Sequence, residues 1–210
     1  MPHDIIDNRR EKLIDHIQCI LPGCQSAKFA VGYFFLSGLE SVAEQLANVK
    51  DLRLLIGNTS SRRTIEQIAE GYRRLEQVQE AAQELAYPRG VDEEQAVQRT
   101  AENIGEAASL MDQTNEAEQV INILVRLIEE ERLKVRVYTK GRLHAKAYIF
   151  DYGQVYDAQG QPLPREELGL GIVGSSNFTL SGVTSNTELN VLVHGNANHA
   201  ALTEWFKELW

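Results

Sequence analysis

The amino-acid sequence predicts an α/β fold in which a mixed β-sheet is flanked by helices. Short apolar runs rich in β-branched and aromatic residues, which are typical of buried strands, alternate with segments of helical pattern. The run at 27–36 is followed by Ser37 and Glu40 in the S-x-x-E spacing of a helix N-terminus, so we expect a helix to about Ala47. The run at 52–57 completes a strand–helix–strand unit, which favours a mixed or parallel sheet.

A helical insertion is expected over about 60–131. Polar stretches of helical pattern occur at 62–86, 92–110 and 115–131, and the last has the firmest apolar stripe at helical spacing. We interpret the first two as an inserted helical hairpin. Its acidic outer face is most simply a solvated surface, and a partner-binding role is the less favoured alternative.

The second half of the chain returns to strand patterns. Strands are expected at 133–139, 142–150, 169–174 and 188–193. The Gly and Pro content of 152–168 predicts an exposed hairpin or loop inserted between two of them. A final helix begins at Asn198 and reaches Trp210 without a glycine cap or polar tail, so we expect this chain to be part of a longer protein. Residues 1–210 are predicted to form a single domain.

Composition narrows the class of protein. Of the 210 residues 43% are apolar, enough for a substantial core, and the formal net charge of −9 argues against a protein that coats nucleic acid nonspecifically. The N-terminal residues lack an apolar signal core, and no run approaches the ~18 apolar residues of a membrane span. Cys19 and Cys24 are the only cysteines, as expected for reduced thiols without a disulfide framework or zinc site. The sequence therefore predicts a cytoplasmic protein that neither spans nor binds a membrane.

The charge is unevenly distributed along the chain. Acidic residues greatly outnumber basic ones from Asp92 to Glu131, whereas the next stretch contains cations and no acid: Arg132, Lys134, Arg136, Lys140, Arg142 and Lys146. Because exposed charges are screened over ~8 Å, a local basic strip can bind an anion on an acidic protein. Lys140 and Arg142 are the candidate substrate contacts, while a solvated strand face explains Arg132 and Lys134 equally well.

The strand expected at 142–150 carries polar groups in an otherwise apolar run. Alternation along a strand places one set of side chains on a single face: Arg142, His144, Lys146 and Tyr148. A neutral imidazole can attack phosphorus or relay a proton, and a lysine ammonium neutralises phosphate oxygens. Asp151 has the opposite parity and lies at the strand end, which favours a structural anchor over a catalytic base. Alone, an H-x-K pattern is also common on ordinary surface strands.

A second polar element, GSSNFT at 174–179, directly follows a predicted strand. Backbone N–H groups around Gly174, the Ser175 hydroxyl and the Asn177 amide could converge on an anion. A simple polar turn is the alternative for this loop taken alone. Glu188 opens the next strand, where its carboxylate could accept a hydrogen bond from an imidazole and fix its tautomer.

Together, H-x-K-x4-D and G-S-x-N resemble the phospholipase D superfamily, and the segment AVGYFFLSGL resembles the first strand and helix of its nuclease-like branch. The resemblance implies that His144 is the nucleophile or the general acid, that Lys146 and Asn177 bind phosphate, that Ser175 is a supporting donor and that Glu188 orients histidine. Asp151 and Gly174 are supporting residues. The family implies hydrolysis of phosphodiesters through a phosphohistidine, with no metal and no cofactor.

Two features depart from the family pattern. G-S-x-N usually follows the aspartate closely, whereas 152–173 intervenes here, which a surface hairpin could absorb. The family site also uses two H-x-K motifs, and this chain has one: His3, His16, His194 and His199 have no lysine two positions later. A complete site therefore requires a second subunit, which predicts a homodimer.

These observations predict a nuclease acting on DNA or RNA. The main alternative is a catalytically inactive nucleic-acid-binding module appended to a helicase or restriction-type protein, with any ATPase motor beyond Trp210 because no phosphate-loop motif occurs in the chain. Retention of His144 and Glu188 favours chemistry, since phosphate binding alone needs neither. A serine hydrolase using Ser175 or Ser176 is disfavoured because no G-x-S-x-G elbow is present.

Overall fold

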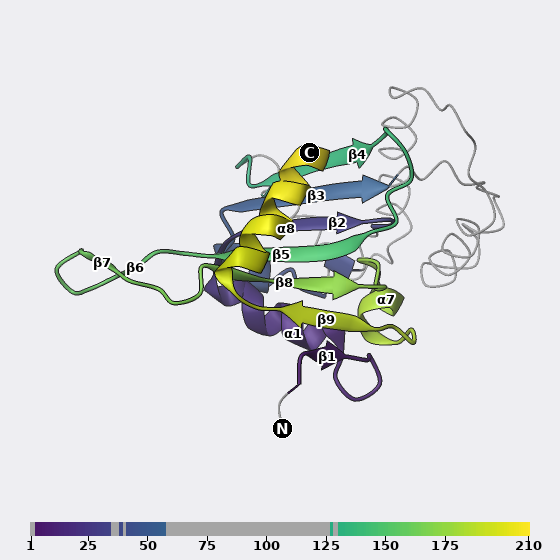
Figure 1. The fold of residues 1–210 in the computed structure, drawn as a ribbon, viewed down its shortest axis with the longest axis horizontal. Coiled ribbons are helices and arrows are strands. Elements are labelled where there is room, and N and C mark those ends of the chain that lie inside the picture. The colour runs from purple at the N-terminus through teal and green to yellow at the C-terminus, as the bar shows by residue number, and fades with distance from the viewer. Residues whose placement is uncertain (1–2, 35–37, 40, 58–126, 128–129) are drawn as a thin grey trace.

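A computed structural model describes residues 3–34, 38–39, 41–57, 127 and 130–210 of the chain. Its centre is a mixed sheet that, among these residues, has seven strands in the order β1-β9-β8-β5-β2-β3-β4 (Figure 1). The strands are β1 (Ile5–Ile6), β2 (Cys24–Val31), β3 (Asp51–Gly57), β4 (Leu133–Tyr138), β5 (Lys146–Tyr152), β8 (Gly169–Gly174) and β9 (Asn190–Val193). Strands β2, β3 and β4 are parallel, and the remaining pairings are antiparallel.

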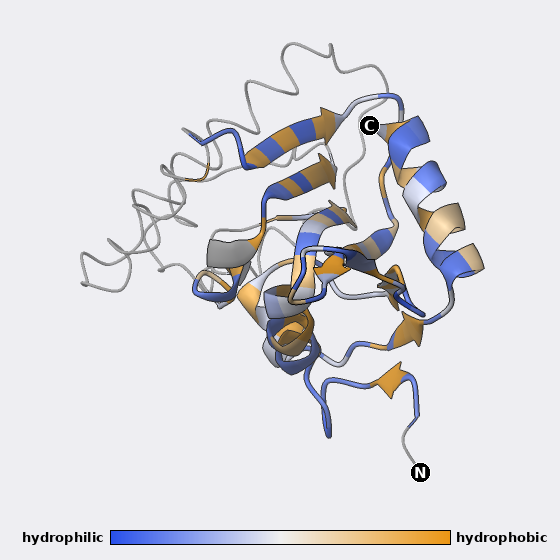
Figure 2. Cartoon of the chain, turned by 90° about the vertical axis from the view of Figure 1, so that its left-hand side faces the viewer, coloured by the Kyte–Doolittle hydropathy of each residue, from blue (hydrophilic) through white to orange (hydrophobic). Residues whose placement is uncertain are grey.

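Helices cover both faces of this sheet, which confirms the predicted α/β class. On one face lie α1 (Leu13–Ile20), the 3₁₀ turns η1 (Leu21–Gly23) and η2 (Gln45–Asn48), and the short α7 (Leu180–Thr184). The long helix α8 (Asn196–Leu209) crosses the opposite face diagonally, from β8 towards β4 (Figures 1 and 2). None of the helices in the described ranges is long and apolar enough to cross a membrane.

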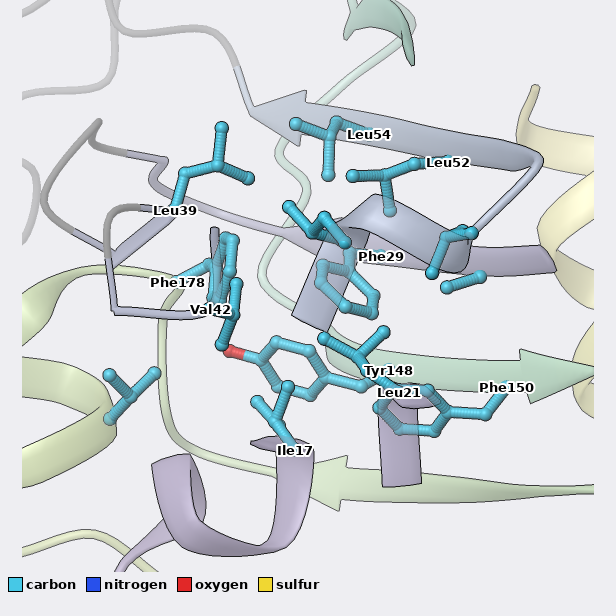
Figure 3. Close-up of a cluster of buried hydrophobic side chains, with 14 of the residues drawn as sticks. Ile17, Leu21, Phe29, Leu39, Val42, Leu52, Leu54, Tyr148, Phe150 and Phe178 are labelled. Carbon is cyan, nitrogen blue, oxygen red and sulfur yellow. The ribbon is translucent and has the colours of Figure 1, made fainter. Parts of the chain in front are cut away.

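The larger core lies between the sheet and α1. An aromatic group occupies its centre, in which Phe29 makes edge contacts with Tyr148, Phe150 and Phe178 at centroid distances of 5.1, 5.7 and 5.0 Å (Figure 3). All four rings are fully buried. Tyr148, predicted to share the site face of the strand with His144 and Lys146, therefore lies in the core instead. Its hydroxyl instead donates a 2.8 Å hydrogen bond to the Ser176 carbonyl, as a buried tyrosine requires.

A smaller core lies beneath α8. Leu55 and Ile149 from the sheet, Leu143 from the segment before β5, and Phe206 from α8 are buried together. Strand β5 is thus covered on both faces. The alternation of 142–150 indicated one exposed face, because the sequence does not reveal that a distant helix covers the other side.

The predicted strands 52–57 and 169–174 are confirmed as β3 and β8, and 133–139 closely matches β4. The strand expected at 142–150 is shorter and begins only at Lys146. Lys146 pairs with Gly174, where β8 ends, and β2 ends one residue past the partner of Ala147. The preceding residues 142–145 therefore have no neighbouring strand on either side in the described part of the sheet.

Two other predicted segments also differ. The strand expected at 27–36 lies earlier, at 24–31. The strand expected at 188–193 begins only at Asn190, and the Leu189 N–H before it donates to the Ser175 side chain. Ser37 and Glu40 lie outside the described residues, and the described residues after Leu39 form turns and η2 rather than an α-helix to Ala47. The helical insertion expected at 60–131 lies outside the described residues except for 127 and 130–131.

A two-stranded hairpin, β6 (Val155–Tyr156) with β7 (Pro162–Leu163), occupies the middle of 152–168. The Tyr152 N–H donates to the Leu168 carbonyl at 2.9 Å and closes its base. Figure 1 shows the hairpin projecting from the end of the sheet opposite to α7. Strands β5 and β8 therefore remain direct neighbours despite the insertion between them.

Candidate active site

Strand register brings the two sequence motifs to one end of the sheet. Lys146, the first residue of β5, pairs with Gly174, the last residue of β8. His144 precedes Lys146 by two residues, and Ser175 follows Gly174 directly. Because β5 and β8 are antiparallel, the entry to one and the exit from the other must meet. The H-x-K segment and the G-S-x-N loop are consequently adjacent, although they are distant in sequence.

The two motif side chains differ in exposure. His144 is exposed on the irregular segment before β5, whereas Lys146 is only 7% exposed. Coulombic attraction strengthens as water is excluded, so a buried ammonium attracts a phosphate more strongly than a surface lysine does. Lys140 and Arg142 are also exposed, on the connection between β4 and His144. Two exposed cations thus lie within four residues of His144 along the chain.

The G-S-x-N loop is clamped by Asn190, a fully buried residue at the start of β9. Its Oδ1 accepts from the Ser176 N–H at 3.3 Å, and its Nδ2 donates to the Ser176 Oγ at 2.9 Å. A Cβ at Gly174 would lie 2.3 Å from Asn190 Oδ1, so only glycine permits this approach. Ser176 itself is fully buried, which excludes it as an exposed nucleophile.

Ser175 is exposed and joins the loop to the strand beside it. Its hydroxyl donates to the Glu188 carboxylate and accepts from the Leu189 N–H at 3.0 Å, while its own N–H donates to the Leu189 carbonyl at 3.1 Å. The N–H groups of Ser175 and Ser176 therefore hold the loop in place. Of the donors predicted to contact an anion, these two backbone groups are thus bonded to protein acceptors.

Asn177 is oriented by the segment after β2. The Tyr33 N–H donates to Asn177 Oδ1 at 3.0 Å, which leaves the Nδ2 group as the donor end of the amide. Phe34 and Phe178 form a parallel β-bridge next to this contact, and a Cβ at Gly38 would lie 2.6 Å from the Phe178 carbonyl oxygen. The close approach of these segments fixes the direction of the amide.

Asp151 lies at the opposite end of β5 from Lys146. The two residues are five positions apart along the strand, a distance of about 16 Å. Its carboxylate accepts from Ser26 Oγ at 2.5 Å and from the Lys28 ammonium, and its Oδ1 lies 3.0 Å from His199 Nε2. These contacts tie β2, β5 and α8 together far from the motif histidine, an environment suited to a structural anchor.

Two neighbours of Asp151 depend on this close packing. A Cβ at Gly169 would lie 2.5 Å from His199 Nε2, so glycine is needed where α8 approaches β8. Burial raises the pKa of Cys24 to about 12, and the negative charge of Asp151 adds to the increase. The Cys24 thiol is therefore neutral at physiological pH.

Within the described residues, no three His, Cys, Asp or Glu side chains are grouped so as to hold a metal ion.

Sequence reasoning missed Asn190, Tyr33 and Gly38. An asparagine within the apolar run at 188–193 was a usable signal, because a polar side chain in a buried strand needs hydrogen-bond partners. Tyr33 acts through its backbone N–H and Gly38 through its lack of a side chain. Neither contribution has a sequence pattern of its own.

Comparison with known families decides the classification. The model of the phospholipase D-like domain described as cardiolipin synthase matches residues 51–210. The chain belongs to the phospholipase D-like family. The resemblance drawn from the H-x-K-x4-D and G-S-x-N residues is thereby confirmed, and all of them lie within the matched range. A search among curated proteins gives no significant match.

Among solved structures, the fold of this chain is similar to that of one phospholipase D family member, and two further structures are similar at lower TM-scores. Nuc, a phospholipase D family member from Salmonella typhimurium, is 12% identical with a TM-score of 0.51, over 100% of this chain and 93% of that one. NucT from Helicobacter pylori is 8% identical with a TM-score of 0.47, over 99% and 94% of the two chains. Yeast tyrosyl-DNA phosphodiesterase is 11% identical with a TM-score of 0.37, over 81% and 26%.

Proposed function

We propose that this phospholipase D-like chain is a cytoplasmic nuclease that hydrolyses phosphodiester bonds of DNA or RNA through a phosphohistidine, with its active site shared across a homodimer. The observation that carries the proposal is the pairing of Lys146 with Gly174, which places the H-x-K segment beside the G-S-x-N loop. This register brings the chain segments that carry an imidazole, a buried ammonium and a side-chain amide to one end of the sheet, which supports a shared role.

In the first step, the neutral imidazole of His144 attacks phosphorus. A nitrogen–phosphorus bond forms as the bond from phosphorus to the leaving oxygen breaks. The leaving oxygen takes a proton from the imidazolium of His144 of the partner subunit, which acts as the general acid. Lys146 and the Asn177 Nδ2 group neutralise and orient the non-bridging oxygens, where charge accumulates in the transition state.

In the second step, water attacks the phosphohistidine. The partner subunit's His144, now neutral, accepts a proton from this water as the new oxygen–phosphorus bond forms and the nitrogen–phosphorus bond breaks. Cleavage of the nitrogen–phosphorus bond leaves the first imidazole neutral, and the proton from water restores the imidazolium of the second, so both histidines are back in their starting protonation states. Glu188 is proposed to orient an imidazole across the site. Its bond with Ser175 fixes the carboxylate on the loop that carries the phosphate ligands.

An exposed apolar row supports the homodimer. Ile5, Val191 and Val173 lie directly opposite one another on adjacent strands β1, β9 and β8, and they are 41%, 37% and 37% exposed. Val173 immediately precedes Gly174, so this row reaches the end of the sheet that carries the motifs. Contiguous exposed apolar side chains favour an interface, and a second copy of the chain would supply the second histidine.

The activity test uses labelled single- and double-stranded DNA and RNA in excess chelator. We expect cleavage by the wild type and a loss of at least ~100-fold in turnover for His144→Ala, the usual value of acid–base or nucleophilic groups. His194→Ala is the matched control, because His194 is exposed and pairs with Glu167 outside the site. Cleavage by His144→Ala at a near wild-type rate contradicts the assignment, and binding without cleavage by the wild type identifies a binding module.

The assembly test combines light scattering with the nuclease assay. Val191→Asp should dissociate the dimer and abolish cleavage, because the charge lies in the apolar row. The pH-rate profile of the wild type should show two apparent pKa values that belong to the histidine pair. A strictly monomeric protein that cleaves with multiple turnovers contradicts the shared site.

A further inference from the structure

A groove lies between the second half of β4 and the end of α8. Figure 1 shows the C-terminal end of α8 crossing the sheet at β4, the last strand of the sheet. The volume of the groove is about 410 Å³. In the described part of the chain it is lined mainly by the second half of β4, the two residues after it and the end of α8, including Arg136, Tyr138, Lys140 and Trp210. The groove therefore combines cations with aromatic rings.

The guanidinium of Arg136 is held in a fixed position in this groove. Its Nη1 donates to the Trp210 carbonyl, and its central carbon lies 4.7 Å from the centroid of the Trp210 ring. The indole is itself stacked on Phe206 at 5.5 Å, and Phe206 is buried in the core beneath α8. A guanidinium ordered in this way loses little conformational entropy when it binds an anion.

Charge is unbalanced along β4. Beside the beginning of β4, the carboxylate of Asp51 on β3 lies 2.8 Å from Arg53 Nε and 3.6 Å from Lys134 Nζ. This carboxylate offsets the charge of both cations. Near the end of β4, no carboxylate side chain among the described residues lies within ion-pair distance of Arg136 or Lys140. These two cations therefore favour an anionic ligand in the groove although the chain is acidic overall.

Only a short stretch of chain separates the groove from the proposed nuclease site. Lys140 lines the groove, and the chain then runs through Arg142 to His144. Four residues span at most about 14 Å, which corresponds to about four stacked nucleotides at 3.4 Å each. A strand whose scissile phosphate lies at His144 can therefore reach the groove with its neighbouring phosphates.

We propose that this groove binds the phosphate backbone of the substrate strand a few nucleotides from the scissile phosphate, with Arg136 and Lys140 as its cations. The inference rests on the proposed nuclease function and adds a determinant of substrate length to it. Polyanionic nucleic acid fits the unbalanced cations better than a neutral peptide strand does. A small phosphodiester would reach His144 without touching the groove.

The test compares Arg136→Ala and Lys140→Ala with Lys207→Ala, a matched loss of one cation from an exposed residue that pairs with Glu204. Affinity for fluorescein-labelled single-stranded 12-mers of DNA and RNA is measured by anisotropy over a range of salt. We expect about 10-fold weaker binding for each groove variant, and a salt slope smaller by about 0.7 for each phosphate that the protein no longer neutralises. Far-UV circular dichroism verifies folding, and Arg136→Lys tests for partial rescue by charge.

The second readout is the ratio of kcat/KM for the 12-mer to kcat/KM for bis(p-nitrophenyl) phosphate. This ratio should fall about 10-fold in the groove variants and stay constant in Lys207→Ala. Groove variants that bind the 12-mer within twofold of the control overturn the inference even if the wild type is a nuclease. If the wild type does not cleave but the groove variants still bind the 12-mer more weakly than it does, the groove proposal is supported and the nuclease proposal is refuted.

Discussion

Removal of the Asn190 side chain should destabilise the chain and disorder the G-S-x-N loop together. Asn190→Ala eliminates both buried bonds to Ser176, at 3.3 and 2.9 Å. Each neutral hydrogen bond is worth about 1 kcal/mol net, and the polar atoms left behind add a desolvation penalty. We therefore expect the free energy of unfolding to fall by about 2–3 kcal/mol, or the Tm to fall by about 4–12 °C for a chain of this size.

Ser176→Ala provides the matched comparison. It removes the bond to Asn190 Nδ2 but keeps the bond from its backbone N–H to Oδ1, so the expected loss is smaller, about 1–2 kcal/mol. A double-mutant cycle by urea denaturation isolates the side-chain pair, with an expected coupling of about 1 kcal/mol. Additive losses would show that the two side chains do not interact as described.

The nuclease assay separates this loop from a purely structural contact. Because Asn177 lies one residue after Ser176, loosening the clamp should lower kcat as well as stability, even at temperatures where Asn190→Ala is fully folded. Undiminished kcat in a folded Asn190→Ala protein would refute the reasoning that the clamp positions Asn177.

Three further outcomes are expected. Lys146→Ala should weaken substrate binding as well as turnover, because a buried phosphate partner is removed; unchanged anisotropy and rate would exclude it from the site. Cleavage should persist in excess chelator because histidine supplies the nucleophile, and strict dependence on added magnesium would contradict this mechanism. The raised pKa of Cys24 means that its neutral thiol stabilises the fold fully below pH 9.0, and that this contribution is lost as the pH rises towards about 12. The free energy of unfolding, measured by urea denaturation from pH 8 to 11, should therefore fall more for the wild type than for Cys24→Ala. Equal decreases for the two proteins would refute this role of Cys24.

The sequence predicts the strands well where the pattern that identifies them lies within a few neighbouring residues. Strand period and residue type suffice to place β3 and β8, and antiparallel pairing of neighbouring strands is a general expectation for such a fold. The same local patterns misplace Tyr148. Alternation assigns a side chain to one face of a strand, but whether that face is covered depends on elements far along the chain. Here both faces of β5 are covered.

Hydrogen-bond partners of the candidate site are harder to predict. The pairing of Ser175 with Glu188 and the use of the Ser175 and Ser176 N–H groups against β9 depend on how the loop turns after Gly174. Sequence indicates that these groups are polar and close to a strand end. It does not indicate whether they bind one another or a ligand, because both arrangements satisfy the same donors and acceptors.

The length of the hairpin at β6 and β7 does not affect the register of β5 and β8, which positions the candidate site. Asp151 and Gly169 are paired in register, so the intervening loop leaves and re-enters the sheet at neighbouring positions. Its closed base and exposed tip make it a tolerant place for foreign sequence. An affinity tag, a fluorescent domain or a surface-attachment peptide inserted near Gly160 would be carried at the end of the sheet remote from His144. The hairpin tip is thus a suitable attachment site for immobilising the protein with its candidate active site facing solution.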